Sequence, residues 1–287
     1  MDRSAFLLSL AAAGATTQHA LAFGDAPQPF TAEEQRGRGR LGVTAVDLRD
    51  GRRIAQRGHE RFPLASTFKL PLVMDVLTRV DRGTVRLDAK VAFRASEILA
   101  YSPSFGPTPH AGTKTVAELC EAAIEHSDNT AANLLLRITG GPPGVTAYLR
   151  ALGDSVTRLD HTEPALNRDA PGDVRDTTTP DAMANLLTRL VRDPILSPAS
   201  KARLFEWLRR ADTGQTRIRA GVPRDWTVGD KTGTTATGGN DVAILWPPHN
   251  RAPIVLAIYF AEVHGTDEAR DAAIAAVARR VIPMFRR

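Results

Sequence analysis

A serine and a lysine lie three residues apart in the sequence Ser66-Thr67-Phe68-Lys69, directly before a stretch with helical hydrophobic spacing. At this spacing both side chains lie on one face of a helix, so the lysine amine can reach the serine oxygen. The N-terminus of that helix adds unpaired N–H groups and positive potential, which stabilise an anion formed at Ser66. The pattern predicts a serine nucleophile with a neighbouring base, although a helix-capping serine followed by a surface lysine has the same spacing.

Two more short motifs follow in chain order. Ser127-Asp128-Asn129 stands between a helical pattern and the apolar run 134–136, and Lys231-Thr232-Gly233-Thr234 stands on a predicted strand. Gly233 has no side chain, so a ligand can approach the backbone of that strand closely. Taken singly, these motifs also fit a polar linker and an edge-strand lysine. All three motifs in this order, at the ends of elements, predict a single catalytic cleft.

The elements that must position these motifs have clear hydrophobic patterns. Residues 41–48 and 52–55 flank an Asp50-Gly51 hairpin signal, and residues 226–231, 242–246 and 254–260 have the composition of three further strands. Almost every segment between the two groups has helical periodicity, and a last helix follows Thr266. Strands at both ends with helices in the middle predict one sheet built from both termini, with a helical domain inserted into it.

The composition indicates a soluble globular chain. Of its 287 residues, 43% are hydrophobic and 24% are charged, and its mean hydropathy of −0.20 excludes a bundle of membrane helices. The net charge of +5 is spread over single or paired basic residues, so the sequence predicts no nucleic-acid partner. Cys120 is the only cysteine, which excludes an internal disulfide.

The first 22 residues predict an export signal. Arg3 precedes the apolar run 5–13, and Ala20-Leu21-Ala22 fits the small-residue pattern of a signal peptidase site. The apolar run is too short to span a bilayer, which takes about 20 residues. We expect cleavage after Ala22 and a periplasmic or secreted protein. A frayed N-terminal helix or a start codon assigned late would also explain this segment.

The combination of motifs resembles the class A serine β-lactamases, and the resemblance covers nearly all of the chain after residue 22. A fourth match strengthens it, because residues 158–167, with Glu163-Pro164 and Asn167, and the closing residues 175–180 resemble the Ω-loop of that family. Penicillin-binding proteins share the first three motifs but lack this loop.

This resemblance implies a fold, domain boundaries and an activity. We expect an α+β or α/β fold in which helices flank a five-stranded antiparallel sheet. The sheet domain would comprise residues 23–58 and 212–287, and residues 59–211 would form an inserted all-helical domain with the Ω-loop at 158–176. The implied activity is hydrolysis of the lactam amide of penicillins and cephalosporins, which confers β-lactam resistance. The implied partners are small β-lactam substrates, with no cofactor, metal, nucleic acid or membrane, and the chain would be a monomer.

Site roles follow from the resemblance residue by residue. Ser66 would be the nucleophile, Ser127 would relay a proton to the departing lactam nitrogen, and Glu163 would activate water for deacylation. A cis peptide bond is implied after Glu163, and the backbone N–H groups of Ser66 and Thr234 would form the oxyanion hole. The implied catalytic set is Ser66, Lys69, Ser127 and Glu163, and the substrate-binding set is Asn129, Asn167, Lys231, Thr232, Thr234, Arg217 and Tyr101.

Two roles have competing candidates. Lys69 can accept the serine proton only as a neutral amine, which requires its pKa to fall by about 3 from ~10.4, roughly 4 kcal/mol. Glu163 needs far less tuning and could act through water, so both residues are candidates for the acylation base. Arg217 matches a carboxylate-binding arginine of one branch of the family, and Arg219 is its rival.

His161 departs from the family pattern, because an arginine usually stands there and clamps the Ω-loop to the aspartate matched by Asp176. If His161 pairs with Asp176, a protonated imidazole would hold the loop more firmly than a neutral one. The imidazole could instead be neutral and merely hydrogen-bonded, or Arg158 or Arg175 could have taken over the clamp.

Two other functions use the same nucleophile. A D-Ala-D-Ala carboxypeptidase or penicillin-binding protein would form a long-lived ester, and Glu163 and Asn167 argue against it. A β-lactam sensor domain would be acylated once and would then signal. The sequence shows no transmembrane segment, which argues against this function.

Overall fold

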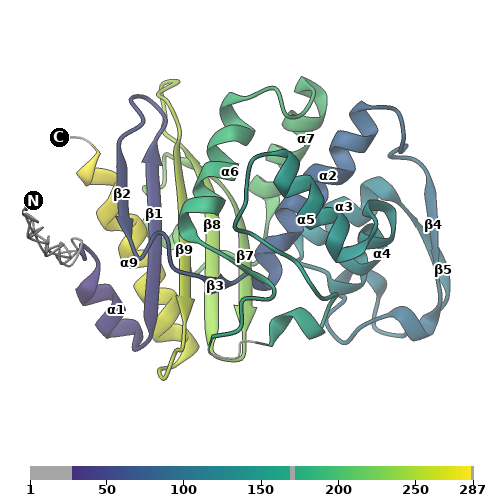
Figure 1. Ribbon diagram of the computed structural model, residues 1–287, viewed down its shortest axis with the longest axis horizontal. Helices are drawn as coiled ribbons and strands as arrows, with labels where there is room; N and C mark the ends of the chain where they lie inside the picture. Colours follow the sequence, from purple (N-terminus) through teal and green to yellow (C-terminus); the bar gives the residue numbers. More distant parts are fainter. Residues whose placement is uncertain (1–27, 169–171, 286–287) are drawn as a thin grey trace, which may run out of the picture.

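The structure, a computed structural model, describes residues 28–168 and 172–285 (Figure 1). The expected signal peptide and its cleavage site after Ala22 lie outside these residues. No helix within the described ranges is long and apolar enough to cross a membrane.

An antiparallel sheet of five strands has the order β2-β1-β9-β8-β7 (Figure 1). Its strands come from both ends of the chain, so the predicted sheet architecture is confirmed. The β1–β2 hairpin turns at Asp50-Gly51, and Gly51 has a positive φ of 79°, which a residue without a Cβ adopts freely. The strands are β1 (Arg40–Asp47), β2 (Arg53–Gln56), β7 (Thr227–Thr235), β8 (Gly238–Trp246) and β9 (Ile254–Ala261).

Both faces of the sheet are buried, because alternate residues of its strands join different hydrophobic cores. On β9, the even-numbered residues 254–260 share a core with α9 (Asp267–Met284), and the odd-numbered residues face the helical part of the chain. Helix α1 (Thr31–Gly37) packs beside α9, so the first and last helices are neighbours (Figure 1). Helix α6 (Pro180–Arg192) contacts β1, β8 and β9 from the opposite face.

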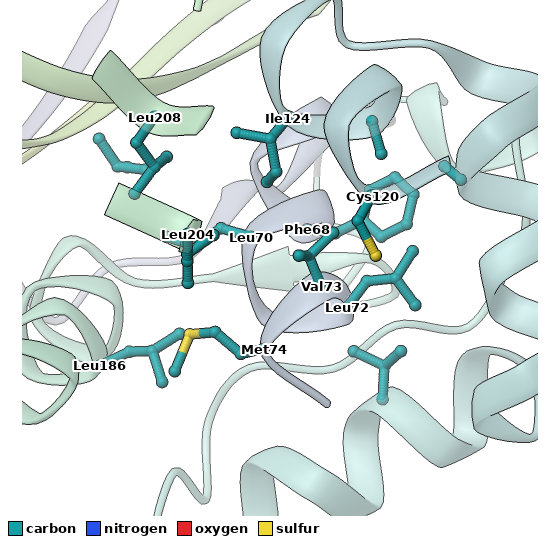
Figure 2. Packing of buried hydrophobic residues seen from close by; sticks show 14 of the residues in the cluster. Phe68, Leu70, Leu72, Val73, Met74, Cys120, Ile124, Leu186, Leu204 and Leu208 are labelled. Carbon is teal, nitrogen blue, oxygen red and sulfur yellow. The ribbon is translucent and has the colours of Figure 1, made fainter. Parts of the chain in front are cut away.

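The helical part is arranged around α2 (Lys69–Asp81), which is buried over most of its length. Figure 2 shows side chains from α2 and the turn before it among those of α3, α6 and α7. Close packing on several sides fixes the helix that carries the serine–lysine motif. The remaining helices are α3 (Val116–Glu125), α4 (Asn129–Thr139), α5 (Gly141–Ala151), α7 (Pro198–Arg210) and α8 (Ile218–Gly221), and the 3₁₀ turns are η1 (Ala65–Phe68), η2 (Ala95–Glu97), η3 (Pro103–Phe105) and η4 (Ala165–Asn167).

The inserted part also contains two short strand pairs that helical periodicity did not predict. Strand β4 (Lys90–Phe93) pairs with β5 (Gly112–Thr115), and β3 (Phe62–Pro63) pairs with β6 (Thr177–Thr178). Strands of this length show too few residues for a periodic pattern to be recognised. The β3–β6 pair joins the chain just before Ser66 to the end of the segment 158–176.

Candidate active site

Ser66 lies in turn η1, immediately before α2, and Lys69 is the first residue of that helix. The Nζ atom of Lys69 donates to Ser66 Oγ at 2.8 Å, so the spacing of the motif brings the two groups into direct contact. Ala65, which precedes the serine, has a φ of 43°, a left-handed conformation that non-glycine residues adopt rarely. Such conformations often occur at functional sites, where surrounding structure holds them.

Strand β7 passes close to the serine because Gly233 has no side chain. A Cβ at this position would lie 3.1 Å from the backbone nitrogen of Ser66 and 3.0 Å from the Cβ of Ala65. These separations are tighter than ordinary contacts, so a larger residue would push β7 away from the serine. The glycine therefore allows strand β7 to lie close to the backbone of Ser66.

Lys69 is fully buried and its Nζ atom is surrounded by oxygen atoms. It donates to the backbone oxygen of Ser127 at 2.7 Å and to Asn129 Oδ1 at 2.6 Å, and it lies 3.1 Å from Glu163 Oε1. Burial lowers the pKa of Lys69, and the negative charge of Glu163 opposes that shift. The structure thus connects the serine to the glutamate through one buried amine.

A second buried lysine lies on the other side of Ser127. Lys231 donates to Ser127 Oγ at 2.9 Å, and Lys69 lies 3.4 Å from the same oxygen. Burial, together with the positive charge of Lys69, holds the pKa of Lys231 well below its usual value. Asp128 caps α4 by accepting from the backbone N–H of Ala131 at 2.9 Å, which fixes the turn between Ser127 and the helix.

Glu163 is held by two asparagines, and the peptide bond to Pro164 is cis. Asn133 on α4 accepts from the backbone N–H of Glu163 at 3.0 Å and donates to its backbone oxygen at 2.9 Å. Asn167 Nδ2 donates to Glu163 Oε2 at 2.7 Å. Asn133 belongs to none of the sequence motifs, although it follows Asn129 by four residues and therefore lies on the same face of α4.

The two candidate arginines, Arg217 and Arg219, point in different directions. Arg217 lines the cleft and contacts Thr234 Oγ1 at 2.9 Å and Asp271 Oδ1 at 3.0 Å. It also donates to the backbone oxygens of Gly233 and Asn240, each at 2.8 Å, which ties β7 to β8. Arg219 instead forms an ion pair with the buried Asp230 at 2.5 Å. The structure therefore brings Arg217, and not Arg219, to the predicted carboxylate-binding residues.

Two buried carboxyl groups, Asp230 and Asp241, lie on neighbouring strands under this region. Asp241 Oδ2 accepts from the backbone N–H of Ile218 at 3.0 Å, while Asp230 pairs with Arg219. Within the described residues, each carboxyl keeps one buried oxygen for which no protein donor is found. Burial raises the pKa of both groups, and the charge of Asp230 helps to hold the pKa of Asp241 well above its usual value. Both carboxyl groups are therefore protonated more readily than an exposed aspartate.

A cleft of about 700 Å³ lies over Ser66, Ser127 and Thr234. Tyr101 is half exposed at this cleft, and its backbone oxygen accepts from the N–H of Asn129 at 3.1 Å. In the described part of the chain, no cluster of three or more His, Cys, Asp and Glu residues could hold a metal ion. The cleft is lined by Ser66, Tyr101, Ser127, Asn129, Asn167, Asp212, Thr213, Arg217, Thr232, Gly233 and Thr234.

The ends of the segment 158–176 meet at Asp176. The Oδ1 atom of Asp176 accepts from the backbone N–H groups of Asp160 and His161 at 2.7 and 2.9 Å, and its Oδ2 atom lies 2.6 Å from His161 Nδ1. Arg158 pairs with Asp160 instead, and Arg175 with Asp173. Of the three candidates for the clamp, the structure places His161 against Asp176.

Comparisons with known proteins agree with this geometry. A family model described as the beta-lactamase enzyme family matches residues 28–285. Beta-lactamase L2 of Stenotrophomonas maltophilia is 46% identical over 270 residues, which cover 93% of this chain and 88% of that protein. The carbapenem-hydrolyzing beta-lactamase KPC of Klebsiella oxytoca is 43% identical over 254 residues, covering 88% and 86% of the two chains. An ancestral class A β-lactamase superposes with a TM-score of 0.85 at 53% identity, covering 88% of this chain and 97% of that one. The chain therefore belongs to the class A β-lactamases and is a serine β-lactam hydrolase.

Proposed function

We propose that this enzyme hydrolyses penicillins and cephalosporins through an ester on Ser66, with the residue roles argued below. The observation that carries the proposal is the continuous buried contact from Ser66 through Lys69 to Glu163 and Asn167. This contact supports a mechanism in which a nucleophile, an amine with a lowered pKa and a carboxylate base act on one substrate.

In acylation, Ser66 Oγ attacks the lactam carbonyl carbon and loses its proton. Lys69 Nζ is 2.8 Å away and can take that proton directly, because burial favours its neutral form. Glu163 can take it through a water molecule, so both routes are retained. The backbone N–H groups of Ser66 and Thr234 stabilise the oxyanion, and Ser127, which contacts both lysines, passes a proton to the lactam nitrogen.

In deacylation, Glu163 removes a proton from the water that attacks the ester. Asn167 supports this step, because its amide nitrogen holds one carboxylate oxygen of Glu163. Its Oδ1 atom is buried and has no hydrogen-bond donor among the described residues, so it can orient a water molecule. This pair favours turnover over the long-lived ester of a penicillin-binding protein or a sensor domain.

The substrate is held from two sides of the cleft. Asn129 binds the side-chain amide of the substrate, while Lys231, Thr232, Thr234 and Arg217 bind its carboxylate. Arg217 supplies a planar, permanently charged donor that suits a carboxylate. Turnover of these substrates gives the β-lactam resistance that the family relationship implies.

The roles are tested by following hydrolysis of a chromogenic cephalosporin. The parent should complete many turnovers per molecule, and Ser66→Ala should abolish hydrolysis. Ser104→Ala is a matched control, because the buried Ser104 Oγ has no hydrogen-bond partner among the described residues. Persistent turnover by Ser66→Ala, or a single stoichiometric burst from the parent, would contradict the proposal.

We also propose that residues 1–22 are removed on export, and that the mature enzyme is a monomer in the periplasm or outside the cell. The small-residue pattern at Ala20-Leu21-Ala22 supports this proposal. N-terminal sequencing of the mature enzyme should begin at Phe23, and sedimentation should give the mass of one chain. An intact Met1 on the enzyme recovered outside the cytoplasm would contradict the cleavage.

A further inference from the structure

One acidic residue in the cleft has no part in the proposed mechanism. Asp212 lies between α7 and α8 and lines the cleft beside Thr213. Its side chain is 59% exposed, its Oδ2 atom lies 2.8 Å from His126 Nδ1, and its backbone N–H donates to the oxygen of Glu125 at 3.1 Å. The carboxylate is therefore accessible to a ligand while its backbone is fixed.

An exposed aromatic ring lines the same cleft. Tyr101 is 52% exposed, and the only other exposed large hydrophobic residue in the described ranges is Val174, at 46%. Burial of part of the ring raises the pKa of the Tyr101 hydroxyl, and the negative charge of Asp212 raises it further. The charge of Asp212 therefore acts on the Tyr101 hydroxyl, and both residues line one cleft.

The position of Asp212 relative to the substrate follows from Thr213, the next residue. Thr213 Oγ1 lies 2.7 Å from Thr232 Oγ1, and Thr232 belongs to the proposed carboxylate-binding group. In a cephalosporin, the ring carbon next to the carboxylate-bearing carbon carries a variable substituent. In a penicillin, the corresponding carbon carries two methyl groups. When the carboxylate of a cephalosporin is bound at Thr232, this substituent would therefore point towards Thr213 and Asp212.

The negative charge of Asp212 opposes the binding of any β-lactam, because every substrate brings its own carboxylate to Thr232 and Arg217. A positive charge on the neighbouring substituent reverses the sign of its interaction with Asp212. An aromatic face attracts the same kind of cation, and quaternary nitrogen groups are recognised by aromatic rings in this way.

We propose that Asp212 and Tyr101 form a cation-binding subsite that favours cephalosporins with a quaternary ammonium or pyridinium group on the substituent beside the carboxylate. This inference rests on the proposed orientation of the substrate carboxylate at Thr232. It assigns Asp212 to substrate selection and not to bond breaking.

The test compares two cephalosporins that are identical except for this substituent, a pyridiniummethyl group in one and a neutral acetoxymethyl group in the other. The measured quantity is the ratio of kcat/KM for the cationic compound to that for the neutral compound. Asp212→Asn should lower this ratio about two- to fivefold, the range for an exposed charge pair. Asp212→Lys should lower it further, and the effect of either change should shrink as salt is raised to about 1 M.

Asp88→Asn is the matched control, because it removes the same charge from an exposed ion pair with Arg86 that does not line the cleft. Its ratio should equal that of the parent. Equal ratios in Asp212→Asn, Asp212→Lys and Asp88→Asn would overturn the subsite while leaving the serine mechanism intact. A change in the ratio that does not respond to salt would also overturn it, because a purely structural effect of the substitution has no such dependence.

Discussion

Replacement of Arg217 by alanine tests which arginine serves the substrate. The Nη2 atom of Arg217 carries two hydrogens, and one of them contacts Thr234 Oγ1 at 2.9 Å. We assign the second to the substrate carboxylate. A hydrogen bond to a charged group contributes about 1.5–3 kcal/mol, and each 1.36 kcal/mol changes a rate tenfold, so Arg217→Ala should lower kcat/KM about 10- to 150-fold.

The same change at Arg219 should act on stability instead. Arg219→Ala leaves the carboxyl of Asp230 buried without its cation, and breaking a buried ion pair costs about 3–5 kcal/mol. At about 2–4 °C per kcal/mol for a chain of this size, the melting temperature should fall by roughly 6–20 °C. The kcat/KM of the folded enzyme should stay close to that of the parent, because Arg219 does not line the cleft.

The two variants are compared by steady-state hydrolysis of a penicillin at about 25 °C, with the folded fraction measured by circular dichroism under the same conditions. Thermal unfolding gives the stability of each variant. Correction for folded enzyme matters because Arg217 also ties β7 to β8 through the backbone oxygens of Gly233 and Asn240. If Arg219→Ala lowers the corrected kcat/KM as much as Arg217→Ala does, the assignment of the carboxylate site is wrong.

Three further predictions concern charge and protons. The Glu163→Gln enzyme should still be acylated but should stall at the ester, because the amide keeps the shape of the carboxylate without its basicity. Mass spectrometry after penicillin addition should show the acyl-enzyme. Turnover at the parent rate would exclude Glu163 as the base. Asp241→Asn keeps a hydrogen-bond donor for Asp230 but removes the carboxyl that titrates. Because the pKa of Asp241 is raised in the folded state, the free energy of unfolding of the parent falls as pH rises from about 4 towards that pKa. The variant should therefore gain in melting temperature over the parent as pH rises, and a difference independent of pH would argue against the raised pKa of Asp241. His161→Arg should raise the melting temperature, because arginine carries a permanent charge beside Asp176. An unchanged or lower melting temperature would show that a permanent charge at this position does not strengthen the clamp.

Local spacing explains why much of the site was predictable. The contact between Ser66 and Lys69 depends on three residues of helical chain, and the contact between Glu163 and Asn167 on a single turn. The main strands were recognised because hydrophobic residues fill both faces of the sheet, with turn residues such as Asp50-Gly51 between them. The short pair β4–β5 was not recognised, because four residues carry no usable period.

The amino-acid sequence by itself determined the contact between Ser66 and Lys69, the motif order and the sheet built from both termini, because these depend on residue types and on regular periods along the chain. Only the tertiary structure decided which arginine reaches the cleft, since Arg217 has irregular dihedral angles just before α8, where neither a helical nor a strand period applies. It also decided that His161 meets Asp176 and that Asp212 lies in the cleft. These contacts join segments that approach one another only when the buried cores pack, and no local period encodes such distances.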